Sequence, residues 1–230
     1  MAIPLRDIAP NLWMLSYPLK LLGVNVGRNV TVIRLASRKL IIHSTAPFSA
    51  GDVAAIKGLG EPAWIADMML RHDTFAREGH TALPSARYLA PAGFSKSLGF
   101  DTEPLIPPPA EWADEIAVAA IDGAPEFGEV VMLHRPSRTL IVEDLIFNFA
   151  GTQNLWTKLF LRLATVGGRH EPGMTLPFKM AIKDGAAYAA SIKTILAWDF
   201  DRIIVGHGTP IATGGKEKLR STLQAAGVSI

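Results

Sequence analysis

The sequence predicts an α/β fold built from layers of sheet and helix. Two observations lead to this prediction: apolar, strand-length segments occur in two groups, and each group is interspersed with segments of helical spacing. The order is strands, helix, strand, helix, strand, and then a similar succession, although no residue-level repeat links the two parts. With 230 residues, the chain is expected to form a single domain over residues 1–230.

The first group contains five expected strands, at residues 11–16, 29–35, 39–43, 63–66 and 87–91. The first of these is expected to be an edge strand or a strand-like arm, and the next two should form a hairpin. Ser49 should begin a helix, because Asp52 occupies the position of a weak capping box. A second helical stretch is expected over residues 74–78.

The second group follows a proline-rich stretch, residues 101–112, which is expected to be an irregular surface loop. Its strands are expected at residues 116–121, 129–134, 139–143 and 203–205. The second and third of these form the clearest hairpin in the sequence. Helices are expected at residues 153–166, 184–197 and 216–226.

The segment 153–166 is amphipathic, with apolar residues at helical spacing on one face and polar residues on the other. We expect the apolar face to pack on the domain. Two alternatives remain open at this point. The helix could form a homodimer contact, or it could attach the protein to a membrane surface through Leu155, Trp156, Leu159 and Phe160.

Composition excludes several classes of function. A formal net charge of +2 is by itself too small to indicate binding to nucleic acid or to an anionic membrane. The absence of cysteine excludes disulfides and thiolate ligands, so a metal site would use His, Asp and Glu, which suit zinc, iron or manganese. No signal pattern and no transmembrane segment of about 18 apolar residues is found, so a soluble, cytoplasmic protein is expected.

Candidate chemistry gathers where apolar strands end. His72 and Asp73, Asp144 and His207 each follow such a strand, and His43 ends a fourth. Strand ends at one edge of a sheet open onto the same crevice, so these residues could converge although they are far apart in sequence. Two imidazoles and two carboxylates are a reasonable set of ligands for one divalent ion.

Each of these residues also has a structural explanation. Asp73 could be the N-cap of the following helix, His72 a loop residue, and Asp144 a turn residue that bonds to backbone. His207 could simply cap its strand and bond to backbone. It lies between Gly206 and Gly208, whose lack of a side chain would let another group approach closely. The remaining histidines, His80, His134 and His170, are expected in surface turns without a role.

Other catalytic patterns are missing from the sequence. It contains no Gly-x-Ser-x-Gly motif and no cysteine nucleophile. The Gly214-Gly215-Lys216 segment lacks the rest of a phosphate-binding loop, and no Gly-x-Gly-x-x-Gly follows a strand. Nucleotide-dependent and redox enzymes of the common kinds are therefore not expected.

The sequence resembles the metallo-β-lactamase superfamily from about residue 29 to residue 223. The similarity is carried by the hairpin that leads into Ile41-Ile42-His43-Ser44-Thr45, by the strand 64–66 with its loop, by residues 140–147 and by Ile203-Ile204-Val205-Gly206-His207-Gly208. The resemblance implies a four-layer αββα sandwich with its site at one edge of the two sheets. It also implies that Asp144 and His207 correspond to the family's late aspartate and final histidine ligands.

The family's His-x-His-x-Asp-His signature is altered in this chain. The equivalent stretch has Met68 and Leu70 where the resemblance places histidines, and its last pair appears reversed, as His72-Asp73. Ala124 stands where a further histidine ligand is expected. The resemblance therefore indicates a degenerate branch of the superfamily, for which it supplies a fold but no substrate.

Two functions follow from these observations. In one, His72, Asp73, Asp144 and His207 bind one ion, with Asp73 and Asp144 serving in catalysis, and the protein hydrolyses an ester, thioester, lactone or phosphoester. His43 would then orient a ligand from behind. In the other, the protein is a pseudoenzyme without a metal, whose fold serves as a binding module.

Overall fold

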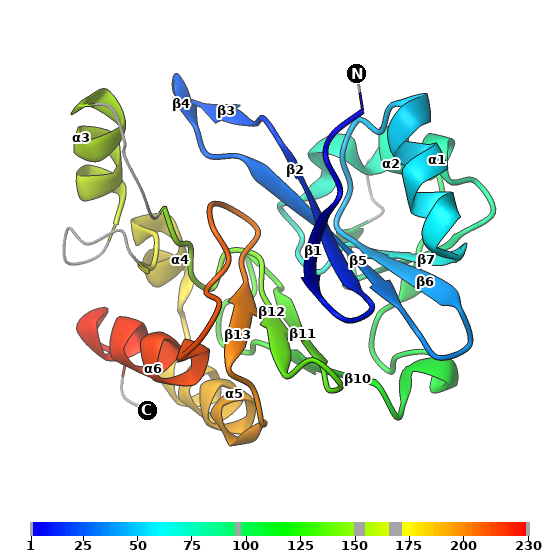
Figure 1. Cartoon of the computed structure of the whole chain (residues 1–230). Helices are drawn as coiled ribbons and strands as arrows, with labels where there is room; N and C mark the ends of the chain where they lie inside the picture. Colours follow the sequence, from blue (N-terminus) through cyan, green and yellow to red (C-terminus); the bar gives the residue numbers. More distant parts are fainter. Residues whose placement is uncertain (1, 95–97, 150–154, 166–171, 229–230) are drawn as a thin grey trace. The chain divides into compact units, whose positions relative to one another are not determined.

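The computed structural model describes residues 2–94, 98–149, 155–165 and 172–228. The chain consists of two compact units, Met1–Tyr17 with Arg28–Glu115 (unit 1) and Pro18–Gly27 with Ile116–Ile230 (unit 2). Each unit contains one main β-sheet together with helices (Figure 1). The predicted α/β class is therefore confirmed.

Unit 1 is built on a seven-stranded sheet in the order β1-β2-β5-β6-β7-β8-β9. Its strands are β1 (Arg6–Ala9), β2 (Leu12–Tyr17), β5 (Arg28–Arg34), β6 (Lys39–His43), β7 (Glu61–Ala66), β8 (Arg87–Ala90) and β9 (Glu103–Pro104). Pairing is antiparallel from β1 to β6 and parallel from β6 to β9. The hairpin predicted from residues 29–43 is confirmed. The segment 11–16 is not an edge strand, because β1 pairs with its outer side.

Helix α1 (Ala50–Leu59) connects β6 to β7 and begins where the sequence predicts. Ser49 is its N-cap, and reciprocal hydrogen bonds with Asp52 complete the capping box. The 3₁₀ turn η1 (Asp73–Phe75) leads into α2 (Ala76–Ala82) after β7. Ile56 of α1 and Ala76 of α2 pack with one face of the sheet in the core of unit 1.

The proline-rich stretch 101–112 is more ordered than predicted. It contributes β9 to the parallel edge of the sheet and forms the 3₁₀ turn η3 (Ala110–Trp112). Trp112 is fully buried and lies edge-on to Trp64 of β7, with ring centroids 5.8 Å apart. A buried aromatic pair therefore holds this segment on the sheet, which the proline content alone does not reveal.

Unit 2 is built on the sheet β10-β11-β12-β13. The elements are β3 (Lys20–Leu21), β4 (Val24–Asn25), β10 (Ile116–Ala120), β11 (Val130–His134), β12 (Thr139–Ile141), α3 (Leu155–Ala164), α4 (Leu176–Ala181), α5 (Gly185–Ala197), β13 (Arg202–Ile204) and α6 (Gly215–Ala225). The β11–β12 hairpin and helices α5 and α6 confirm the predictions. The small β3–β4 hairpin and α4 were missed.

Helix α3 does not pack on the domain through the face that the sequence predicts. Of the predicted range 153–166, residues 155–165 are described, and Thr157 and Leu161 are the buried side chains of the helix. Leu155, Trp156 and Leu163 are more than half exposed, so the apolar face expected against the domain is mostly in contact with solvent. The prediction that this face packs on the domain is wrong, because the opposite side of the helix meets the core.

The register of β12 and β13 positions the candidate site. These two strands are parallel, and Ile141 pairs with Ile204. The last two residues of each strand are apolar and buried, as is typical of parallel strands covered on both faces. The chain continues from each as an equally buried valine, Val142 or Val205. The segments that follow the two strands therefore leave the sheet at the same edge.

Within the described ranges, no helix is both long enough and apolar enough to cross a bilayer.

Candidate functional site

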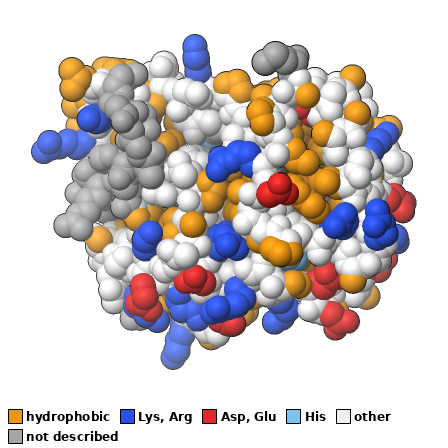
Figure 2. Space-filling model, viewed as in Figure 1, with side chains coloured by type: hydrophobic (Ala, Val, Ile, Leu, Met, Phe, Trp, Pro, Cys, Tyr) orange, Lys and Arg blue, Asp and Glu red, His pale blue; other side chains and the backbone are white. Residues whose placement is uncertain are grey.

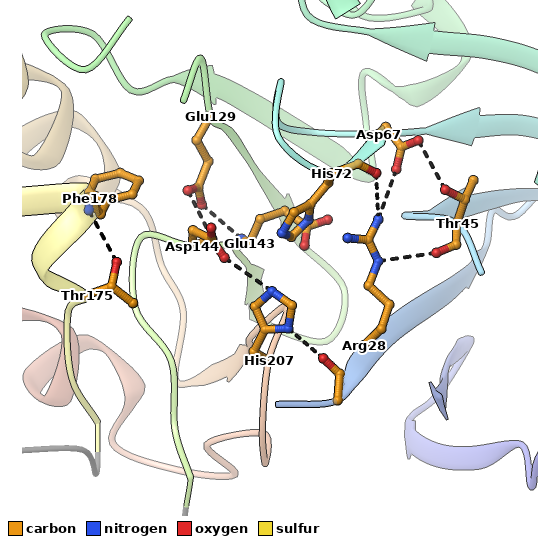
Figure 3. A network of polar contacts seen from close by, with 11 residues as sticks. Arg28, Thr45, Asp67, His72, Glu129, Glu143, Asp144, Thr175, Phe178 and His207 are labelled. Carbon is orange, nitrogen blue, oxygen red and sulfur yellow. Dashed lines mark hydrogen bonds and ion pairs between the residues drawn. The ribbon is translucent and has the colours of Figure 1, made fainter. Parts of the chain in front are cut away.

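Asp144 and His207 of unit 2 lie side by side beyond the paired ends of β12 and β13 (Figure 3). Their closest atoms, Asp144 Oδ1 and His207 Nε2, are 3.4 Å apart. The Asp144 side chain is 21% exposed and the His207 side chain 17% exposed, so both are accessible to a small ligand. The structure thus brings together two of the residues that the sequence analysis expected to converge.

A backbone carbonyl sets the protonation of the His207 ring. Its Nδ1 lies 2.6 Å from the carbonyl oxygen of Gly27, which can only accept a hydrogen bond. Nδ1 therefore carries a proton and donates it. In the neutral ring, Nε2 then has a lone pair, and this lone pair is the form in which histidine binds a metal.

The Nε2 lone pair of a neutral His207 would face a carboxylate oxygen, which is also an electron-pair donor. Two such atoms at 3.4 Å need a positive charge shared between them. Ligands held at about 2.0–2.2 Å in tetrahedral geometry are about 3.3–3.5 Å apart, so the separation fits two ligands of one zinc ion. It equally fits an ion pair between a protonated His207 and Asp144. The residues present are thus compatible with a metal.

Glu129 holds the backbone that carries Asp144. This carboxylate is 1% exposed and accepts hydrogen bonds from the backbone N–H of Glu143 at 2.9 Å and from that of Asp144 at 3.1 Å (Figure 3). Buried carboxylates that receive backbone donors are strongly held in place. Glu129 therefore fixes the segment beyond β12 at the point where Asp144 leaves it.

The two glycines beside His207 allow the segment that follows β12 to approach the backbone around His207 closely. A Cβ on Gly206 would lie 2.4 Å from Glu143 Oε2, and one on Gly208 would lie 2.1 Å from the Asn148 carbonyl oxygen. Gly208 also has a φ of 96°, which favours glycine. Thr209 N–H donates to the Asn148 carbonyl at 2.6 Å, and Asn148 Nδ2 donates to the Thr209 carbonyl at 2.9 Å. The close approach predicted around His207 is confirmed.

In unit 1, a buried guanidinium holds the loop that contains His72. Arg28, which is 1% exposed, donates through its terminal nitrogen to the His72 carbonyl at 3.0 Å and through Nε to the Thr45 carbonyl at 3.2 Å (Figure 3). The same terminal nitrogen lies 3.6 Å from Asp67 Oδ1. Arg28 therefore connects the segments that follow β6 and β7.

Asp67 also accepts a hydrogen bond from the Tyr88 hydroxyl of β8. Burial, and then the charge of Asp67, raise the pKa of Tyr88 well above its usual value, so this hydroxyl stays protonated and keeps donating. The buried Asp67 is thus surrounded by donors from three strands or their loops. It is an internal carboxylate with a structural role.

The other predicted residues of unit 1 differ in exposure. His72 is 4% exposed and His43, at the end of β6, is 2% exposed. Asp73 is exposed at the first position of η1 and its side chain caps neither η1 nor α2. The alternative in which Asp73 is the N-cap of the following helix is therefore wrong.

The three apolar residues at the positions expected for family histidines belong to the interior. Met68 is 0% exposed and Ala124 is 1% exposed, while Leu70 packs against the core of unit 1. None of these side chains offers the nitrogen or oxygen donor that a zinc ligand would supply in place of histidine. Their burial gives each a packing role instead.

His134 is not a surface residue, contrary to prediction. It ends β11 with 0% exposure, and its Nδ1 lies 2.6 Å from Ser137 Oγ in the β11–β12 turn. Burial lowers the pKa of His134 to about 4, so its ring is neutral at pH 7. His80 is partly buried and stacks on Phe100, and His170 lies outside the described residues.

Sequence reasoning missed the two residues that position the candidate ligands. Glu129 directly precedes the apolar run of β11, and Arg28 begins the apolar run of β5. A charged residue that opens a strand buried on both faces must find buried partners. That signal was available, but the partners themselves are 14 or more residues away and could not be read from the local pattern.

No family model and no curated protein matches the sequence. Solved structures of metallo-β-lactamases do match, over almost the whole chain. The enzyme from Hirschia baltica is 12% identical with a TM-score of 0.66, and the alignment covers 98% of each chain. The enzyme from Erythrobacter litoralis is 17% identical with a TM-score of 0.66, over 98% of this chain and 96% of that one.

A third similar structure is the metallo-β-lactamase FIM-1 from Pseudomonas aeruginosa in its mono-zinc form. It is 15% identical with a TM-score of 0.62, over 99% of this chain and 96% of that one. At these identities the similarity shows the fold. The protein has the metallo-β-lactamase fold that the sequence resemblance implies.

Proposed function

We propose that the protein binds one divalent metal ion and hydrolyses an ester, thioester, lactone or phosphoester. The observation that carries this proposal is the pairing of His207 Nε2 with Asp144 Oδ1 at 3.4 Å, while Nδ1 of the same ring is occupied by the Gly27 carbonyl. This arrangement directs a nitrogen donor and an oxygen donor toward one small volume. A divalent cation can bind both donors at once.

His72 of unit 1 is the third ligand in this proposal. With Asp144 and His207 it would supply two imidazoles and one carboxylate, a set of donors that suits a divalent ion. Catalytic zinc sites commonly use three protein ligands of this kind and keep a fourth position open. Zinc, iron and manganese all suit such a set. A structure of similar fold, FIM-1, exists in a mono-zinc form.

A bound divalent ion would lower the pKa of water and polarise the scissile carbonyl or phosphoryl group. Asp144 is suited to orient the attacking water, because its backbone is fixed by Glu129 and its carboxylate is partly exposed. The exposed Asp73 is the second proposed acid–base group and the remaining candidate ligand. His43 is proposed to orient a ligand without binding the ion itself.

Metal analysis of protein purified without chelator tests the proposal. We expect about one equivalent of zinc, iron or manganese after incubation with the metal, and loss of it in Asp144→Ala, His207→Ala and His72→Ala. Asp199→Ala is the matched control, since Asp199 is exposed and pairs with Arg138 at 2.7 Å. Less than about a tenth of an equivalent in the wild-type protein would exclude the hydrolase.

Activity is then measured on the metal-loaded protein. A panel of nitrophenyl esters, thioesters, lactones and phosphodiesters should identify one class that the wild-type protein hydrolyses. The same substrate should be left intact by His207→Ala and hydrolysed normally by Asp199→Ala. Equal rates in the wild-type protein and His207→Ala would contradict the proposed role of the site.

The second candidate is a metal-free binding module. It is favoured by the buried, non-ligating side chains Met68, Leu70 and Ala124, and by the fact that a protonated His207 would also satisfy Asp144. In that case Asp144 and His207 form an ion pair that joins the segments after β12 and β13. Wild-type protein that takes up no metal but loses stability in both single variants would support this function.

A further inference from the structure

We propose that α3 and the β3–β4 hairpin of unit 2 form a surface that binds an anionic lipid bilayer. Helix α3 exposes four large apolar side chains: Leu155 is 85% exposed, Trp156 57%, Leu159 49% and Leu163 70%. Figure 2 shows hydrophobic side chains at the upper left, where α3 lies in Figure 1, with Lys and Arg side chains beside them. Water-exposed apolar groups of this size normally mark a binding surface.

The helical wheel arranges these side chains as an interfacial helix requires. At about 100° per residue, Leu155, Leu159, Leu163 and Trp156 occupy one arc of about 100°. Thr157 and Leu161, which are buried, lie on the opposite side of the helix. The core of unit 2 has therefore used one side of α3 and left the main apolar arc uncovered.

The cations of α3 border the apolar arc. Lys158 and Arg162 are exposed and lie within about 60° of its edge on the wheel. Long basic side chains at such a boundary can reach lipid headgroups while the apolar arc enters the acyl region. Tryptophan is also enriched at the membrane interface, because its ring is apolar and its N–H is polar.

The β3–β4 hairpin extends this surface. Leu21 is 54% exposed and Leu22 is 74% exposed at its tip. The hairpin lies against the helix, because a Cβ on Gly23 would be 3.8 Å from Trp156 Nε1. Val26 and Phe160 pack on the same small cluster of buried residues, which includes Leu161. Two segments far apart in sequence thus present one apolar surface.

The charge of this surface selects its partner. Residues 18–27 and 155–164 contain no acidic residue, and Lys20, Lys158 and Arg162 are their charged side chains. Cations of one sign attract the anionic headgroups of a bilayer. A symmetric dimer through α3 would instead bring the cations of two copies together, which costs free energy. The bilayer is therefore the occupant that the composition favours.

The test is co-sedimentation with vesicles at low ionic strength. Wild-type protein should bind vesicles of phosphatidylcholine that contain about a quarter phosphatidylglycerol, and should bind phosphatidylcholine alone much less. Trp156→Ala with Leu159→Ala should weaken binding at least about ten-fold. Lys158→Gln with Arg162→Gln should weaken binding to the anionic vesicles about twenty-fold and remove most of its salt dependence.

Matched control variants distinguish binding through this surface from non-specific binding of the protein to vesicles. Ile106→Ala removes an exposed apolar side chain of unit 1, and Lys193→Gln with Lys218→Gln removes two exposed cations of α5 and α6. Both controls should bind as the wild-type protein does. A blue shift of tryptophan emission on vesicle binding should also be reduced in Trp156→Phe, although that variant still sediments.

Three results would overturn the proposal. One is wild-type protein that stays in the supernatant with anionic vesicles, and another is equal binding by the α3 variants and the controls. The third is a stable dimer in analytical ultracentrifugation that Trp156→Ala with Leu159→Ala converts to monomer. That result would assign the surface to a second copy of the chain.

Discussion

His207 meets Asp144 because both lie three residues beyond a register pair of parallel strands, Ile204 of β13 and Ile141 of β12. The hydrogen bonds between the following segments preserve this alignment, from Gly206 N–H to the Glu143 carbonyl and from Thr209 N–H to the Asn148 carbonyl. The distance of 3.4 Å between the imidazole and the carboxylate is therefore a consequence of sheet register. Variants that disturb the register or its supports should disturb the site.

Replacing Glu129 with alanine should weaken the candidate site by removing the support of the backbone at Asp144. The variant leaves the buried N–H groups of Glu143 and Asp144 without their acceptor, so the free energy of unfolding should fall by about 2–4 kcal/mol. Metal affinity should fall about 10–100-fold, as is usual when a support of a ligand is removed. Urea unfolding and metal titration provide the two measurements.

Glu126→Ala is the control for that variant. Glu126 is exposed and lies 3.8 Å from Lys183, so its removal should change stability by less than about 1 kcal/mol. Similar losses in Glu126→Ala and Glu129→Ala would show that the buried carboxylate does not hold the backbone of Asp144.

Alanine at Gly206 should be far more harmful than alanine at a helical glycine. Its Cβ would lie 2.4 Å from Glu143 Oε2 and 3.0 Å from the Glu143 carbonyl oxygen, which forces the two segments apart. Gly58 in α1 has no atom within 4 Å of an added Cβ, so Gly58→Ala should stabilise the protein by about 0.5–1 kcal/mol. Thermal unfolding compares the two, and an unchanged melting temperature in Gly206→Ala would contradict the packing described.

The buried Arg28 should contribute much more to stability than an exposed arginine. Arg28→Met leaves the fully buried Asp67 without its cation and releases the His72 carbonyl, so a loss of about 3–5 kcal/mol is expected. Arg87 donates to Glu103 at 2.9 Å, but that pair is half exposed and Arg87→Met should cost less than about 1 kcal/mol. Chemical denaturation of both variants is the measurement, and equal losses would be the contrary result.

Stability should fall in mild acid because of His134. Burial lowers the pKa of this ring from its ordinary value of 6.5 to about 4 in the folded protein. Between these values the unfolded chain binds a proton that the folded protein does not bind, so the free energy of unfolding decreases as pH falls. At pH 4.5 the loss from this group alone should be about 2–3 kcal/mol.

His134→Gln isolates this contribution. Carboxyl groups titrate in the same range, so the informative quantity is the difference between variant and wild type at pH 7 and at pH 4.5. The variant should lose less stability than the wild-type protein on acidification. A parallel decline of both proteins would show that His134 does not titrate on unfolding.

Local patterns in the sequence determined much of the fold. Alternation and β-branched runs located β5, β6, β11 and β12, and the Ser49 and Asp52 pair located the start of α1. The position of His207 between two glycines correctly predicted a close approach of other chain segments. Each of these features depends on residues that are near one another in sequence. The local pattern of residues is therefore enough to predict it.

The tertiary structure decided which groups meet. The bonds from Glu129 to the backbone beyond β12, and from Arg28 to the His72 carbonyl, join residues whose pairing depends on strand order and register. The periodicity of α3 revealed an amphipathic helix, but only packing decided that Leu161 would face the core and Leu155 the solvent. The burial of a side chain depends on which sheet and helices pack against it. It therefore cannot be predicted from the sequence of one segment.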